Sequence, residues 1–325
     1  MALTIVAWLA AAGALGLAGC WLYWRLCAAP IAAIAPAREW LVPGAPADAA
    51  AGIPRRVWSY WHDDRPPEVV RRCVAQWRRL NPGYEVHLLS ARTVADFLPD
   101  APAGLARLGI PKQSDWIRLA LLARHGGIWL DSSIILTEPL DWMLHKQQAS
   151  GAQYLGFYLD RYAAGDARPL VDSWAMAAPA ASPFVLGWLA LFRAQVVEGE
   201  GGTDGTAAYL QSLRAQGRFD DVVQKIGSPA YHTVHVCAQD LLQRRPGAWR
   251  LLLLRAEDSA YALQARSRWK RRRLYLHLLL NPVPVPCTPL VKLRGGERRK
   301  LEPYLRLEFF RARSIVGRYL PGSAD

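Results

Sequence analysis

Residues 114–133, which read SDWIRLALLARHGGIWLDSS, decide the fold of this chain. Ser114 is a good helix N-cap, because its hydroxyl accepts a hydrogen bond from an unsatisfied backbone N–H. Asp115 in the first turn suits the positive end of the helix dipole. Arg118 lies three residues further on, so it shares a helix face with Asp115. We therefore expect a helix that begins at Ser114 and presents an acidic and a basic side chain together.

The end of this stretch predicts a turn from the helix into a strand. Gly126 is a plausible C-terminal stop for the helix. The apolar residues 128–130 predict a short buried strand. Asp131 follows them at the carboxyl end of the strand, where open α/β sheets bind their ligands. The stretch thus predicts a carboxylate at the edge of a sheet, beside an Asp115–Arg118 pair.

The surrounding chain alternates strands with helices. Residues 56–61 and 85–89 predict strands, residues 70–77 mark one face of a helix, and Thr93 caps another short helix. The connections are too long for hairpins, so the pattern favours a parallel sheet with right-handed crossovers. This is a Rossmann-like α/β domain with its ligand across the strand carboxyl ends. Further on, the pattern predicts helices at 184–197 and 231–242, a glycine-rich loop at 198–205 and a buried strand at 249–254.

The ordered set Ser-Asp-x-x-Arg, helix, Gly-Gly-x-aromatic-x-Asp strongly resembles the capsular polysaccharide synthesis family of glycosyltransferases. That family is related to DXD-containing sugar transferases, which include yeast outer-chain mannosyltransferases and clostridial glucosylating toxins. Residues 53–61 (IPRRVWSYW) and 77–86 (WRRLNPGYEV) resemble two further landmarks of the family. The likeness runs from about residue 53 to about residue 145.

The resemblance implies a GT-A glycosyltransferase domain, which we place at residues 53–290. It also implies a retaining transfer from a nucleotide-sugar donor. By this resemblance Asp115 and Arg118 hold the donor sugar, and Asp131 contacts a metal ion or the diphosphate. These three are the predicted catalytic residues. The predicted donor-binding residues are Trp58, Tyr60, Trp61, Ser114, Asp115, Arg118, Trp129 and Ser133.

The family pattern places a second carboxylate at position 133, where this chain has serine. Mn²⁺ or Mg²⁺ would be the expected cofactor, but hard divalent cations want several oxygen ligands. Asp131 is the main predicted ligand, Ser133 contributes a hydroxyl directly or through water, and His232 or His235 completes the site. The departure leaves metal dependence open. In the plainer alternative, Asp115 is only a capping residue and Arg118 its ion-pair partner.

The N-terminus predicts a membrane anchor at residues 1–27. Residues 2–24 carry no charge, and about 20 apolar residues span a bilayer as a helix. The first basic residues, Arg25 and Arg38, follow the apolar run, so the positive-inside tendency places the rest of the chain in the cytoplasm. We expect a single-pass protein of the inner (cytoplasmic) membrane. Residues 28–52, rich in Ala and Pro, predict a linker.

Two other interpretations of the N-terminus compete with the anchor. A cleaved secretory signal begins with a basic region, which is missing here. Leu17-Ala18-Gly19-Cys20 matches a lipoprotein cleavage box, so lipidation at Cys20 is the alternative. The apolar run continues beyond Cys20, which favours the uncleaved anchor.

The charge and cysteine content of the chain indicate which kinds of partner it binds. The net charge of +13 favours anionic partners, and no nucleic-acid-binding signature is present. The basic run at 266–273, which contains Trp269, and the basic amphipathic C-terminal segment at 291–325 favour an anionic membrane surface. The five cysteines show no paired spacing or zinc motif, and Cys73 is expected in the core.

The sequence therefore predicts a membrane-anchored glycosyltransferase. It would move a sugar from a nucleotide-sugar donor to a surface (capsular) polysaccharide or a lipid-linked glycan acceptor. The alternative is a non-catalytic, glycosyltransferase-like scaffold or polysaccharide-binding protein, which the serine at position 133 motivates.

Overall fold

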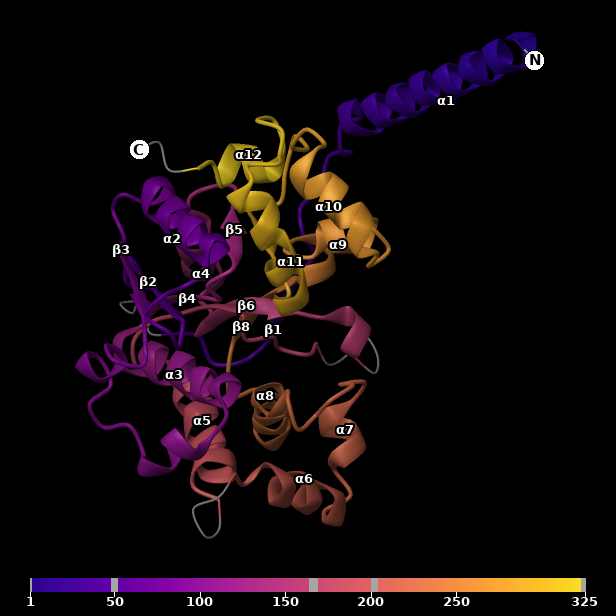
Figure 1. Ribbon diagram of the computed structural model, residues 1–325. Helices are drawn as coiled ribbons and strands as arrows, with labels where there is room; N and C mark the ends of the chain where they lie inside the picture. The colour runs from indigo at the N-terminus through magenta and orange to yellow at the C-terminus, as the bar shows by residue number, and fades with distance from the viewer. Residues whose placement is uncertain (1, 48–51, 164–168, 200–203, 323–325) are drawn as a thin grey trace.

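The computed structural model describes residues 2–47, 52–163, 169–199 and 204–322. Within them a seven-stranded sheet of order β1-β8-β6-β7-β4-β2-β3 forms the centre, and helices cover both faces (Figure 1). Its strands are β1 (Glu39–Val42), β2 (Arg56–Tyr60), β3 (Glu85–Leu89), β4 (Gly127–Leu130), β6 (Tyr154–Tyr158), β7 (Ala175–Ala178) and β8 (Leu251–Arg255). A two-stranded sheet pairs β5 (Ile134–Leu136) with β9 (Leu290–Lys292).

The helices fall into two groups about the sheet (Figure 1). One group contains α2 (Glu68–Leu80), α4 (Asp141–Ser150), α9 (Ala262–Arg266), α10 (Arg271–Leu279), α11 (Gly295–Arg306) and α12 (Ile315–Tyr319). The other contains α3 (Ile110–His125), α5 (Pro183–Phe192), α6 (Thr206–Ala215), α7 (Phe219–Val223) and α8 (Thr233–Arg244). The short turns are η1 (Val94–Asp96), η2 (Ala103–Arg107), η3 (Asp160–Tyr162), η4 (Arg193–Val197) and η6 (Ala256–Asp258).

The sheet is mixed, so the expected parallel sheet is only partly right. β2 is parallel to β3 and β4, and β6 is parallel to β8. β7 runs antiparallel between β4 and β6, and β1 is antiparallel to β8 at one edge. The predicted parallel arrangement therefore holds for the three strands between residues 56 and 130. It fails where β7 and β1 enter the sheet.

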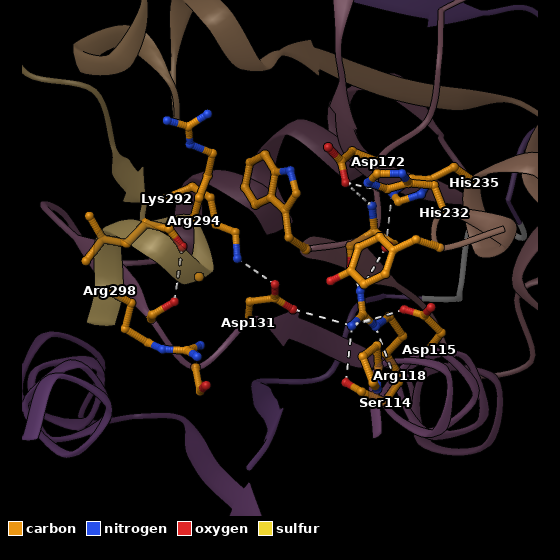
Figure 2. A pocket seen from close by; sticks show the side chains of 18 of the residues that line it. Ser114, Asp115, Arg118, Asp131, Asp172, His232, His235, Lys292, Arg294 and Arg298 are labelled. Atoms are coloured by element: carbon orange, nitrogen blue, oxygen red, sulfur yellow. Dashed lines mark hydrogen bonds and ion pairs between the residues drawn. The ribbon is translucent and has the colours of Figure 1, made fainter. Parts of the chain in front are cut away.

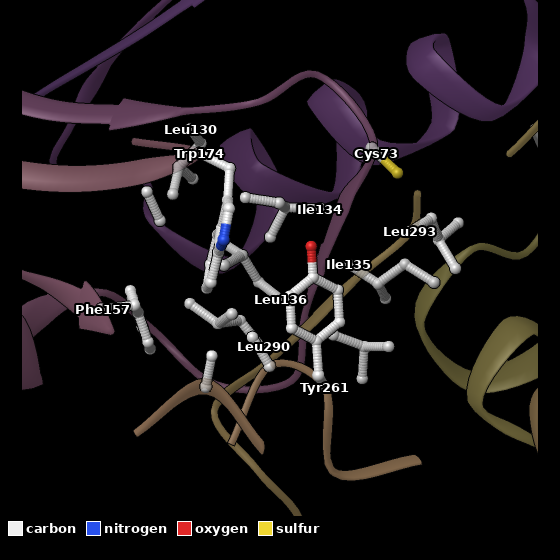
Figure 3. Packing of buried hydrophobic residues seen from close by; sticks show 14 of the residues in the cluster. Cys73, Leu130, Ile134, Ile135, Leu136, Phe157, Trp174, Tyr261, Leu290 and Leu293 are labelled. Atoms are coloured by element: carbon white, nitrogen blue, oxygen red, sulfur yellow. The ribbon is translucent and has the colours of Figure 1, made fainter. Parts of the chain in front are cut away.

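The strands have two buried faces, which explains their continuous apolar character. Val57 and Ile128 lie in one core with α2, whereas Trp58 and Trp129 lie in the other with α3 and α5. Figure 3 shows the first core, where Tyr261 packs among apolar side chains of β5 and β9. The site described below is thus built on strands fixed from both sides.

The helix α3 begins four residues earlier than predicted. Gly109 is its N-cap, and Pro111 occupies the first turn, where the missing N–H of proline costs nothing. Ser114 is therefore inside the helix rather than its cap, and its hydroxyl accepts a hydrogen bond from Arg118 instead. The helix ends as expected at Gly126, which has a φ of 63°.

The segment predicted as a linker takes part in the fold. It contributes β1, which pairs with β8, and it buries Ile31 and Ile34 in the core. Asn281 donates hydrogen bonds to the Leu26 and Ala29 carbonyls, so the base of α1 (Ala2–Ala28) is tied to the end of α10. The strand β1 has no clear pattern in the sequence, because Ala and Pro dominate around it.

The other predicted elements are found close to their expected places. The helix at 184–197 is α5 followed by η4, the helix at 231–242 is α8, and the strand at 249–254 is β8. Residues 200–203 of the predicted glycine-rich loop lie outside the described residues. Cys73 is fully buried, as expected of a core residue, and Cys20, Cys73, Cys237 and Cys287 are free thiols.

Candidate active site

A cavity of about 760 Å³ opens at the carboxyl end of β4. One wall comes from α3 and the turn after β4, and the opposite wall comes from β9 and the start of α11. Figure 2 shows Asp131 between these walls, with Lys292 on one side and Arg118 on the other. The two walls meet at this carboxylate.

Two glycines allow the chain to turn from α3 into β4. Gly126 and Gly127 have φ values of 63° and 104°, a region that favours glycine. A Cβ on Gly127 would lie 2.5 Å from the Arg56 carbonyl oxygen. The absence of side chains here lets β4 pair directly with β2, which fixes the place where Asp131 leaves the sheet.

Arg118 is the most constrained side chain of the first wall. Its guanidinium donates to the Ser173 carbonyl at 2.9 Å, to the Ser173 hydroxyl at 2.8 Å and to the Ser114 hydroxyl at 3.1 Å. It also pairs with Asp115 at 3.2 Å and with Asp131 at 3.6 Å. Its exposed fraction is only 8%, so Arg118 is held in place before any ligand arrives.

Asp131 accepts from cationic and neutral donors at once. Lys292 Nζ lies 2.5 Å from one carboxylate oxygen, and Trp129 Nε1 donates to the other at 3.2 Å. Burial acts to raise the pKa of Asp131, but the charges of Lys292 and Arg118 outweigh it and hold the pKa below its usual value. Asp131 is therefore ionised across the physiological pH range.

The predicted metal ligands do not assemble into a site for a divalent cation. Ser133 is buried, and its hydroxyl donates to the Leu293 carbonyl at 3.2 Å. The His232 ring contacts the Ser228 carbonyl at 3.1 Å, and burial lowers its pKa. No group of three or more His, Cys, Asp or Glu side chains suited to a metal occurs in the described part of the chain. The expected Mn²⁺ or Mg²⁺ would meet one carboxylate that already holds an ammonium group.

A further ion pair at the cavity joins the segment before β7 to α8. Asp172 and His235 Nε2 are 3.0 Å apart, and both side chains are nearly buried. Burial favours neutral His235, but its hydrogen bond and charge contact with Asp172 prevail and raise the His235 pKa. Asp115 differs, because burial outweighs the Arg118 charge and raises its pKa. Asp115 thus gains an ability to hold a proton that Asp131 lacks.

The sequence-predicted residues separate into those that line the cavity and those that support it. The lining includes Tyr60, Trp61, Ser114, Asp115, Arg118, Asp131, Ser133, His232 and His235. Trp58 is fully buried outside the lining, where its indole donates to the Gly126 carbonyl and stacks on His87. Trp129 also lies behind the lining, with Arg118 5.1 Å above its ring. Neither indole is placed to bind a donor directly.

The second wall carries residues that the sequence pattern alone does not select. Lys292, Arg294 and Arg298 line the cavity from β9 and α11. They lie in the segment 291–325, whose basic character predicts contact with a membrane surface.

The position of Trp269 differs from the one that its basic neighbours predict. The basic run around it predicts a place at an anionic membrane surface, but its ring lines the cavity. The guanidinium groups of Arg161 and Arg294 lie 4.4 and 5.1 Å from its ring centroid. Trp269 therefore belongs to the basic wall of the site.

Comparison with known proteins finds similarity to glycosyltransferases over part of the chain. Residues 47–192 match the sequence model of the capsular polysaccharide synthesis protein family. The O-glycosyltransferase braB of Annulohypoxylon truncatum is 30% identical over 161 residues, which cover 43% of this chain and 37% of that protein. The chain is thus similar, over less than half of its length, to proteins of capsular polysaccharide synthesis and to an O-glycosyltransferase. The matched family region includes Arg118 and Asp131 but not Lys292.

Solved structures show weaker likeness. The structure titled PaToxG Glycosyltransferase is 15% identical, covers 80% of this chain and 86% of its own, and superposes with a TM-score of 0.31. A second, the structure of a doubly substituted transferase mutant, is 10% identical, covers 58% of this chain and 94% of its own, and has a TM-score of 0.25. Scores of this size do not establish a shared fold.

Proposed function

We propose that this glycosyltransferase-related chain is an active, membrane-anchored enzyme that transfers a sugar from a nucleotide-sugar donor to a surface polysaccharide or lipid-linked glycan. The observation that carries the proposal is the ionised Asp131 at the carboxyl end of β4, beside a fixed Arg118, in a cavity of about 760 Å³. Ligand pockets span about 300–1,000 Å³. The domain would be of the GT-A type, with its donor across the strand ends.

The side chains of the cavity suit the two halves of such a donor. The sugar hydroxyls need paired donors and acceptors, which Arg118 and Asp115 provide at 3.2 Å from one another. The diphosphate needs positive charge as its bond to the sugar breaks, and the cationic wall opposite supplies it. Tyr60 and Trp61 at the cavity offer aromatic surface for a base.

A retaining transfer agrees with this arrangement. The bond between the sugar carbon and the diphosphate oxygen breaks, and its electron pair leaves with the diphosphate. The acceptor hydroxyl forms the new bond on the same face and gives its proton to the departing diphosphate. This route needs no separate protein base, so Asp131 can stay ionised and electrostatic in its role.

A donor screen tests the proposal. Purified protein is incubated with UDP-, GDP- and CMP-sugars, in Mn²⁺, in Mg²⁺ and in chelator, and release of nucleotide is measured. We expect release from one donor class. A complete lack of release across the panel, with a correctly folded protein and a glycan acceptor present, would contradict an active enzyme.

The serine at position 133 keeps the non-catalytic scaffold as the second candidate. Calorimetry separates the two, because an enzyme of this class binds its nucleotide-sugar and a decayed scaffold does not. Binding of a polysaccharide without binding of any nucleotide-sugar would favour the scaffold.

The location at a membrane rests on α1. Its segment Thr4–Leu26 is long and apolar enough to cross a bilayer, and none of it is buried in the protein. Figure 1 shows α1 projecting from the body beside α10, where Arg271, Arg272 and Arg273 are exposed. We propose that α1 anchors the enzyme in the inner membrane, with the body in the cytoplasm and these arginines near anionic headgroups.

Two measurements test this location. Flotation with vesicles containing anionic lipid should weaken when all three arginines are replaced by glutamine, whereas an unchanged profile would remove them from the membrane contact. Mass spectrometry of the N-terminus addresses the lipoprotein alternative. The helix α1 continues unbroken past Cys20, and a diacylated Cys20 would overturn the anchor.

A further inference from the structure

The cationic wall contacts Asp131, at the end of β4, because β9 pairs with β5. These two strands are far apart in the sequence. β9 pairs with β5 so that Lys292 lies opposite Ile134. Ser133, just before Ile134, donates to the Leu293 carbonyl. These contacts place the Lys292 ammonium 2.5 Å from Asp131, beside the position where a bound cation would otherwise contact that carboxylate.

We propose that Lys292, assisted by Arg298, forms a metal-independent site for the diphosphate of the donor. The two side chains supply the positive charge that a divalent cation would bring. This inference rests on the proposed nucleotide-sugar chemistry, but the cationic site itself is testable without it.

Lys292 is a buried cation with hydrogen-bonding capacity left over. Its exposed fraction is 7%, and it lines the cavity. An ammonium group has three N–H donors, and among the described residues only Asp131 accepts from it. The remaining donors are available to phosphate oxygens in the cavity. An anionic ligand in the cavity would pair with this buried cation and offset the cost of its burial.

The same ammonium opposes a divalent ion at Asp131. A metal on this carboxylate would lie within a few ångströms of Lys292 and near Arg118, and like charges repel most strongly where water is excluded. Ser133 cannot compensate, because a hydroxyl brings no charge. The serine at position 133, where the family pattern has a carboxylate, and the nearby Lys292 ammonium thus both disfavour a divalent ion.

Arg298 adds a second cation at the cavity. Its guanidinium lies 4.5 Å from the centroid of the Trp61 ring, and within the described ranges no carboxylate lies within ion-pair distance of it. Arg294 differs, because Glu297 pairs with it at 2.5 Å. Burial lowers the pKa of Arg298 from its ordinary value, yet arginine keeps its charge in proteins. Asp131 and Glu302 act on the Arg298 charge only from beyond ion-pair distance, so Arg298 is a second cation that could contact a ligand beside Lys292.

Together they would act on the leaving group. As the sugar–oxygen bond breaks, its electron pair moves onto the diphosphate, and both cations stabilise the added charge. The acceptor proton ends on the diphosphate. No oxidant, reductant or further reactant is needed.

Calorimetry with inorganic pyrophosphate, UDP and GDP tests the site directly. The full-length protein is titrated in EDTA and again in Mn²⁺. The variants are Lys292→Met, the charge-balanced pair Lys292→Met with Asp131→Asn, and Arg298→Gln. Arg299→Gln is the matched control, since Arg299 is an exposed neighbour outside the cavity lining.

We expect pyrophosphate to bind in EDTA, with an affinity that Mn²⁺ changes by less than about twofold. Both Lys292 variants should weaken it by about tenfold or more, which corresponds to about 1.4 kcal/mol, and Arg298→Gln by about fivefold. If Lys292→Met does not fold, the charge-balanced pair and Arg298→Gln carry the test.

Two results would overturn the cationic site: pyrophosphate binding that requires Mn²⁺, or binding in EDTA that no variant weakens. The proposed function fails separately. Lys292-dependent binding of pyrophosphate in EDTA without binding of UDP or GDP, and without release from any nucleotide-sugar, would leave the cationic site standing and remove the nucleotide-sugar donor.

Discussion

The two walls of the cavity are built in opposite ways. The first wall comes from one continuous stretch, in which α3, two glycines and β4 place Arg118 and Asp131 close together, and this stretch falls inside the matched family region. The second wall comes from β9 and α11, and its Lys292 is 161 residues from Asp131 in the chain. The first wall is formed by residues that are close together in the sequence, and the second reaches the site through the tertiary fold.

The walls also differ in how far their polar groups are satisfied. Arg118 is bound by Ser114, Ser173, Asp115 and Asp131. Lys292 has one acceptor among the described residues, and Arg298 has none at ion-pair distance there. The first wall, whose side chains are already fixed by hydrogen bonds and ion pairs, is suited to holding a sugar in one orientation. A wall with spare positive charge is suited to a ligand that brings negative charge.

The largest effect within this comparison is expected from Arg118→Lys. Lysine keeps the charge but loses the planar fork that bridges Ser173, Ser114 and two carboxylates. Nucleotide release should fall about 100-fold, as when a positioned transition-state donor is lost. Arg124→Lys on the same helix is the control, because Arg124 is half exposed and pairs with Asp100. Equal rates for both variants would mean that the first wall does not position the donor.

A smaller effect is expected from Arg298→Gln in the second wall. One charge-assisted contact to the diphosphate would be lost, which is worth about 1.5–3 kcal/mol. KM for the donor should rise about tenfold or more, and kcat should fall as well because Arg298 also stabilises the charge that develops on the leaving diphosphate, whereas Arg299→Gln should leave both unchanged. A fall in kcat at constant KM would instead assign Arg298 to the transition state alone.

The sequence explains much of the first wall and little of the second. Apolar periodicity and turn residues locate β2, α2, β3 and β4, and the family resemblance selects Asp115, Arg118 and Asp131. The start of α3 is misplaced because Ser114 satisfies Arg118 rather than the helix end. The alternation of side chains along β2 is visible in the sequence. The sequence does not show that Trp58 lies buried behind the cavity lining rather than in it.

Lys292 could not be selected from sequence because its role depends on the β5–β9 pairing. Nothing local to residues 290–298 indicates that they lie against a turn near residue 131. The same limit applies to Trp269, whose basic neighbours suggest a membrane surface while its ring lines the cavity.

The smallest expected effect concerns the Asp172–His235 pair, which supports the first wall. The His235 pKa is raised and the Asp172 pKa is lowered in the folded protein. Stabilisation from His235 is complete below its usual pKa of 6.5 and is lost as the pH rises through the folded value. Stabilisation from Asp172 is present above its usual pKa of 3.8 and is lost as the pH falls through its lowered value.

His235→Gln should therefore destabilise the protein most at about pH 5.5 and less at about pH 8.5, by about 1–3 kcal/mol at the lower pH. Urea unfolding at the two pH values measures this. His145→Gln is the control, since His145 is exposed. A pH-independent difference would show that the pair is held by packing rather than by charge.

The most direct test of an active site built around Asp131 is the rate of nucleotide release by Asp131→Asn, measured in chelator beside wild type and Asp100→Asn. Asp131 joins the two walls, whereas the Asp100 side chain is 85% exposed and pairs with Arg124. We predict release by wild type and Asp100→Asn without added metal, and at least about a 100-fold loss in Asp131→Asn. Undiminished release by Asp131→Asn would contradict this mechanism, because the carboxylate between the walls would then play no part in the reaction.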